Sequence, residues 1–66
     1  MTISIEDQIK CVKRELTMRG TVYTHQVSRG KMRQDEAVRE IETMRAVLQT
    51  LLHVQAGQQF REGGTT

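Results

Sequence analysis

The chain has 66 residues and a mass of 7.6 kDa, with a net charge of +2, one Cys, no Pro and no Trp. This length allows a single domain at most, and the lone Cys11 excludes an intramolecular disulfide. A globular chain of this size buries only about 60% of its unfolded surface, so a monomer would be marginally stable. Because the sequence offers no disulfide and no Cys/His cluster for structural zinc, we expect self-association to complete the core.

The charge is unevenly divided along the chain. Residues 1–33 carry seven basic and three acidic side chains, a net charge of +4, whereas residues 34–66 carry three and five, a net charge of −2. The imbalance favours attraction between the two halves and is too small to indicate a nucleic-acid-binding protein. No apolar run approaches the roughly 20 residues that span a bilayer, and the N-terminus lacks the apolar segment of a signal peptide. We therefore expect no membrane association and a cytoplasmic location in a bacterial host cell.

The first predicted helix covers about residues 5–28. Ser4 is a suitable N-cap, and Asp7 stands three residues later as the acidic half of a capping motif. An average step close to 3.6 residues, typical of one helical face, separates a set of apolar and small residues: Ile5, Ile9, Val12, Leu16, Gly20, Tyr23 and Val27.

Gly20 leaves three interpretations open. A continuous helix would carry a gap at Gly20 through which another backbone approaches closely, at a cost of about 1 kcal/mol relative to Ala. Alternatively, the helix kinks or stops there and a short helix follows, or residues 21–24, which are β-prone, form a strand. Cys11 lies beside the apolar stripe and is predicted to be a small, semi-buried residue.

A turn over about residues 29–33 separates this helix from the next. Gly30 suits the left-handed position that follows a helix C-cap. So short a connection predicts antiparallel neighbouring helices.

The second predicted helix covers about residues 34–55. Arg33 is placed at its N-cap, with Glu36 reaching back to the Arg33 amide. The repeating apolar positions on its main face are Ala37, Ile41, Met44, Leu48 and Leu52. A second stripe of Val47, Leu51 and Val54 begins near the C-terminal end, which predicts another contact there. Residues 1–56 are thus predicted to form the hairpin, and residues 57–66 a flexible tail.

The predicted fold is all-α: an antiparallel two-helix hairpin that completes a four-helix bundle by homodimerisation or, as the next choice, in a higher oligomer. A lone hairpin leaves the outer edges of both apolar stripes in water, and a second hairpin covers them. The predicted interface residues are Ile9, Val12, Leu16, Val47, Leu48, Leu51, Leu52 and Val54.

Catalytic and metal-binding motifs are missing from the sequence. His25 and His53 are expected at opposite ends of the hairpin, and the glutamates do not form the Glu-x-x-His arrangement of di-iron bundles. No phosphate loop, nucleophile elbow or zinc-protease motif occurs. We therefore predict a protein that is not an enzyme, with no cofactor and no metal.

The most suggestive polar cluster surrounds the turn and would occur twice in a dimer: Tyr23, His25, Arg29, Lys31 and Arg33. Such a set suits an anion, whether a nucleotide, a nucleic-acid phosphate or an acidic protein patch. Alternatively, these charges only keep the turn soluble. A second basic patch, Lys10, Lys13 and Arg14, lies on the outer face of the first helix, but nothing resembles a recognition helix.

Part of the pattern resembles short uncharacterised proteins of proteobacterial phages and prophages. The shared positions cover about two thirds of the chain: Lys13-Arg14-Glu15-Leu16, Val22-Tyr23, Val27, Gly30-Lys31-Met32, Ala37, Glu40-Ile41, Met44 and Ala46-Val47-Leu48. Thr24 and Arg33 depart from it, where the group has Pro and a Ser or Thr cap. The resemblance implies a phage-linked origin, a helical hairpin and no established activity.

We therefore predict a small non-enzymatic accessory protein, a homo-oligomeric helical hairpin that binds a host or phage protein. The alternatives are a counter-defence protein that captures a nucleotide signal, and a nucleic-acid-binding accessory factor.

Overall fold

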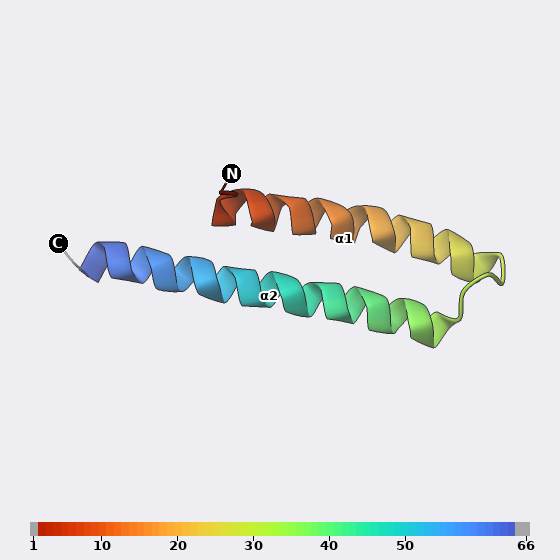
Figure 1. The fold of residues 1–66 in the computed structure, drawn as a ribbon. Coiled ribbons are helices and arrows are strands. Elements are labelled where there is room, and N and C mark those ends of the chain that lie inside the picture. The colour runs from red at the N-terminus through yellow and green to blue at the C-terminus, as the bar shows by residue number, and fades with distance from the viewer. Residues whose placement is uncertain (1, 65–66) are drawn as a thin grey trace.

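A computed structural model describes the backbone of residues 2–64 and the side-chain surroundings of residues 2–58. In this part of the chain the secondary structure consists of two α-helices, α1 (Ile5–Ser28) and α2 (Gln34–Gly64). They lie side by side in opposite directions and are joined by one turn (Figure 1). The all-α class and the helical hairpin predicted from the sequence agree with this arrangement.

The ends of α1 follow from local hydrogen bonding. At its start, the Ser4 Oγ accepts a hydrogen bond from the Asp7 amide at 3.1 Å, as expected for an N-cap. At its end, the Lys31 amide donates to the Gln26 carbonyl at 2.9 Å and the Gly30 amide donates to the Val27 carbonyl at 3.0 Å. This pair of bonds is a Schellman motif, and Gly30 has the left-handed φ of 72° that the motif requires.

Gly20 lies inside a continuous helix, because α1 runs from Ile5 to Ser28 without a break. The interpretations in which the helix stops at Gly20, or residues 21–24 form a strand, are therefore wrong. The close approach of another backbone is also missing within the chain, since a Cβ built on Gly20 would meet nothing within 4 Å. The space beside Gly20 is open.

The start of α2 differs in detail from the prediction. Arg33 precedes the helix as expected, and its carbonyl accepts from the Ala37 amide at 3.0 Å. However, the predicted bond from Glu36 back to the Arg33 amide is absent from the described hydrogen bonds. Instead the Asp35 Oδ1 accepts from the Glu36 amide at 3.0 Å and lies 3.4 Å from the Arg33 Nε. Asp35, in the first turn of α2, thus accepts from a backbone amide there and pairs with the Arg33 guanidinium.

The predicted end of the second helix near residue 55 is wrong, because α2 continues to Gly64. The apolar period stops after Val54, but Gln and Ala are good helix formers, and no Pro interrupts the segment. A helix continues where its backbone propensity allows, even when one face no longer has a partner. Residues 65 and 66 of the predicted tail lie outside the described residues.

The core of a single hairpin is thin. Among the described side chains, Ile9 of α1 and Ala37 of α2 are buried, and the rest of both apolar stripes is at most half-buried. The chain measures 55 × 23 × 16 Å, with a radius of gyration of 15.8 Å. A compact chain of 66 residues would have a radius of gyration of about 11 Å. The hairpin is therefore an extended rod rather than a globule.

Candidate interaction surfaces

A groove of about 600 Å³ runs between the helices near the turn. Its walls come from both helices: Leu16, Thr17, Gly20, Tyr23, Thr24 and Val27 of α1, and Gln34, Ala37, Val38, Ile41, Glu42 and Arg45 of α2. A second, shallower hollow shares Leu16, Thr17, Gly20 and Thr24 with it and adds Thr21 and His25. We call the first of these the groove, and its side of the hairpin the groove side.

The α1 wall of the groove is less polar than its composition suggests. The hydroxyl groups of Thr17 and Thr24 donate to the carbonyls of Lys13 and Gly20, one turn earlier in the same helix, at 3.3 Å and 2.8 Å. These bonds occupy the hydroxyl hydrogens within α1. Together with the missing side chain at Gly20, they make this wall shallow and open.

Several exposed apolar side chains lie away from the groove, whereas Val38, which is also exposed, lines it. On α1, Met18 and Val22 are exposed, and so is Cys11 seven residues before Met18. On α2, Val47 and Val54 are exposed on either side of the half-buried Leu51. The prediction that Cys11 is semi-buried is wrong, because its position on the helix turns it away from α2.

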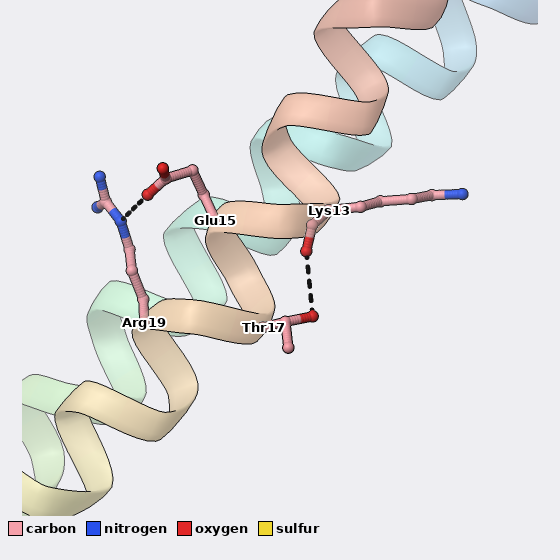
Figure 2. A network of polar contacts seen from close by, with 4 residues as sticks. All are labelled: Lys13, Glu15, Thr17 and Arg19. Atoms are coloured by element: carbon pink, nitrogen blue, oxygen red, sulfur yellow. Dashed lines mark hydrogen bonds and ion pairs between the residues drawn. The ribbon is translucent and has the colours of Figure 1, made fainter.

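Helix geometry places the α1 members of this set on the side opposite the groove. Figure 2 shows Glu15 and Arg19 on one side of α1 and Lys13 on the other, with the groove residue Thr17 hydrogen-bonded to the Lys13 carbonyl. Residues three, four or seven positions apart share a helical face. Three residues have such a spacing from Glu15: Cys11 is four positions before it, Met18 three after it and Val22 seven after it. They therefore lie on the Glu15 side of α1.

The α2 members lie on the same side of the hairpin. At about 100° per residue, Val47 and Val54 are rotated about 180° and 160° from Val38, which lines the groove. The exposed apolar residues of α1 and those of α2 just named thus lie on the side of the hairpin that faces away from the groove. We call this surface the valine face: Cys11, Met18 and Val22 of α1 with Val47, Leu51 and Val54 of α2.

One ion pair lies beside the valine face. The Arg19 Nε donates to the Glu15 Oε2 at 3.2 Å (Figure 2). This side-chain hydrogen bond to Glu15, followed by a side-chain hydrogen bond to Tyr23, raises the pKa of Arg19 above its ordinary value. The pair is neutral as a unit, so it adds no net charge to the surface that it borders.

The predicted interface residues divide into three groups in the structure. Ile9 is buried within the hairpin itself, and Val12, Leu16, Leu48, Leu51 and Leu52 are half-buried. Val47 and Val54 are exposed. Met18 and Val22 were not among the predicted interface residues. Their spacing contains the signal, because Met18 follows Cys11 by seven residues and Val22 follows Met18 by four.

The predicted anion-binding residues are not gathered in one cavity. Tyr23 lines the groove and His25 lines the shallower hollow. Arg29 caps α1, and the Arg33 guanidinium is paired with Asp35. Arg29, Lys31 and Arg33 line neither hollow. Tyr23 and His25 diverge because residues two apart on a helix point about 200° apart.

Two further findings concern residues within the described range. No group of three or more His, Cys, Asp or Glu side chains there is placed to hold a metal ion. Neither α1 nor α2, so far as its residues are described, has a stretch long and apolar enough to cross a bilayer.

Comparison of the chain with protein-family models, curated proteins and solved structures gives no match. The resemblance to phage proteins therefore stays a prediction.

Proposed function

We propose that this protein is a small, non-enzymatic accessory protein that acts by protein–protein interaction, and that its working form is a homodimer in which two hairpins make a four-helix bundle. In this form the valine face is the contact between the two copies. The helix surfaces that remain exposed, the groove among them, bind another protein. A phage association rests on the sequence resemblance alone.

The observation that carries the proposal is the excess of exposed surface on a single hairpin. The chain exposes 5493 Å², whereas a compact monomer of 7.6 kDa would expose about 4,300 Å². The difference of about 1,200 Å² is somewhat more than the roughly 800 Å² that each partner buries in a standard protein interface. One second copy on the valine face is therefore of the right size to remove most of it.

Support for an interaction role also comes from the kinds of side chain that the surface presents. Four of the exposed large apolar side chains, Met18, Val22, Val47 and Val54, belong to the valine face. The basic residues of the turn do not share a cavity with Tyr23, so no observation favours the nucleotide-binding alternative.

Two measurements test the proposal. Light scattering over a range of concentrations should give a dimer, and a strict monomer would contradict it. A thermal-shift screen with cyclic dinucleotides, NAD-derived nucleotides and short DNA should leave the unfolding midpoint unchanged. Stabilisation by a nucleotide would favour the signal-capturing alternative, and DNA binding that weakens steeply with salt would favour the nucleic-acid alternative.

Site-specific photo-crosslinking in the host cell tests the partner. A photoreactive residue at Thr24, in the groove wall, should crosslink to a distinct second protein. The same group at Lys10, which is exposed and lines neither hollow, is the matched control on α1. Equal yields at both positions, or no heterologous product at Thr24, would count against partner binding in the groove.

A further inference from the structure

The geometry points to one kind of partner for the groove: a single amphipathic α-helix of about three turns, supplied by a protein other than this chain. Its apolar face enters the groove with one side chain in the space beside Gly20, and an acidic residue lies near Lys13. This inference rests on the proposed function, in which the groove binds another protein, and it specifies the chemistry of that partner.

The length of the groove fits a short helix. Its lining extends from Leu16 to Val27 on α1 and from Gln34 to Arg45 on α2. At a rise of about 1.5 Å per residue, each wall is roughly 17 Å long, or about three turns of an α-helix. A helix laid along it presents anchor side chains at spacings of three, four and seven residues.

The groove offers apolar surface to one face of such a helix. Val38 on the α2 wall is 50% exposed. On the α1 wall, the hydroxyl hydrogens of Thr17 and Thr24 are bonded to carbonyls of the same helix. An apolar side chain therefore lies against this wall without leaving either hydroxyl hydrogen unpaired. Four large lining residues are also only half-buried by the hairpin: Leu16, Tyr23, Val27 and Ile41.

Gly20 provides a place for one anchor side chain. It lines the groove, and a Cβ built on it would meet nothing within 4 Å. Packed helices insert side chains of one into the gaps between side chains of the other. The missing side chain at Gly20 is such a gap, so a large apolar residue of the partner helix enters it.

Lys13 continues the α1 wall beyond the end of the groove. It stands four residues before Thr17 and seven before Gly20, and these spacings place all three on one helical face. Figure 2 shows its side chain extending away from Glu15 and Arg19, which lie on the other side of α1. A partner helix in the groove therefore has Lys13 within about one turn of its end.

The charge at this end of the groove selects an acidic partner. Lys13 is exposed and takes part in none of the ion pairs formed among the described residues. The two charged residues that line the groove, Glu42 and Arg45, pair with each other at 3.6 Å. The charge left without a partner is thus positive, and an acidic side chain complements it.

An extended peptide and a second copy of the chain fit the groove less well. An extended peptide needs backbone hydrogen-bond partners, as at the edge of a sheet, whereas the described secondary structure consists of two helices. A second copy brings the same positive charge at Lys13. Once the valine face is covered, the excess surface is about 400 Å², half of what each partner buries in a standard interface.

Titration of a synthetic peptide into the 66-residue chain tests the inference. The probe is a fluorescently labelled peptide of roughly 14 residues, held helical by a side-chain crosslink, with Leu at helical spacing on one face and Glu near both ends. The control peptide has Lys in place of each Glu. Fluorescence anisotropy should show weak, reversible binding of the acidic peptide, as expected for a small interface, and binding of the basic peptide that is about threefold weaker or less.

Two pairs of matched variants locate the peptide. Gly20→Leu should weaken binding about tenfold, because the new side chain fills the space that the anchor enters. Gly57→Leu is its control, since a Cβ there also meets nothing within 4 Å and Gly57 lines neither hollow. Both changes introduce a better helix former, so neither should unfold the chain. Lys13→Glu should reverse the preference between the peptides, whereas Arg14→Glu, exposed and turned about 100° from Lys13, should retain it.

Each outcome decides a different point. Binding that is weakened by Gly20→Leu and not by Gly57→Leu, with the charge preference reversed by Lys13→Glu, supports the inference. No binding of either peptide, equal losses in the two Leu variants, or no preference for the acidic peptide overturns it. Light scattering of the same samples tests the proposed dimer separately, because a dimer that binds no peptide overturns the helical partner alone. A monomer contradicts the proposed working form, and a dimer that the peptide dissociates contradicts both.

Discussion

Replacing Val47 by Asp should dissociate the dimer. The change in helix propensity should not by itself unfold α2. Val47 keeps 43% of its surface exposed in the single hairpin. Burying a whole Val side chain contributes about 1.5–3 kcal/mol, so covering the exposed part contributes about 1 kcal/mol per chain and about 2 kcal/mol per dimer. A carboxylate at an apolar contact adds a further desolvation cost. A free-energy change of about 1.4 kcal/mol changes a dissociation constant tenfold, so the dimer Kd should rise by at least about 25-fold.

Val38→Asp is the matched control, because Val38 lies on the same helix and is 50% exposed but lines the groove. It introduces the same residue and the same charge, and it should change the dimer Kd by less than about threefold. Sedimentation equilibrium gives both constants, and circular dichroism monitors helicity. If Val38→Asp dissociates the dimer and Val47→Asp does not, the copies meet through the groove and our reasoning about the valine face is wrong.

Three further substitutions test the local account of the hairpin. Gly20→Ala should stabilise the protein by about 1 kcal/mol, since an added Cβ meets nothing within 4 Å and Ala is the better helix former; a lowered thermal midpoint would indicate that another chain approaches Gly20 closely. Gly30→Ala should destabilise it by about 1–2 kcal/mol, because a φ of 72° strains an L-residue, and an unchanged denaturant midpoint would argue against this turn geometry. Ser4→Ala should cost about 1 kcal/mol through the lost cap, whereas Ser4→Asp should retain the stability; equal losses in both variants would exclude capping by Ser4.

The boundaries of α1 were predictable because strong local signals mark both of them. Ser4 and Gly30 act through one or two backbone hydrogen bonds each, which depend on neighbours in the sequence and not on the rest of the fold. The end of α2 was not predictable from periodicity. An apolar period reports where a helix has a partner, and it is silent about a helix that continues past its partner, as α2 does after Val54.

The candidate site was only partly predictable. The stripe of Val47, Leu51 and Val54 was recognisable in the sequence because the main apolar face of the second helix is complete without Val47 and Val54. Met18 and Val22 are interspersed with charged and polar residues, and their exposure became evident only once α2 had covered the other face of α1. The turn cluster looked coherent in the sequence because its members are close in number, but the helical twist sends Tyr23 and His25 into different hollows.

Sedimentation equilibrium of the unaltered 66-residue chain, combined with thermal unfolding at several concentrations, tests the central claim most directly. The account predicts a species of twice 7.6 kDa at micromolar concentration, dissociation on dilution, and an unfolding midpoint that rises with concentration. A 7.6 kDa species at every concentration, unfolding cooperatively at one fixed midpoint, would contradict it.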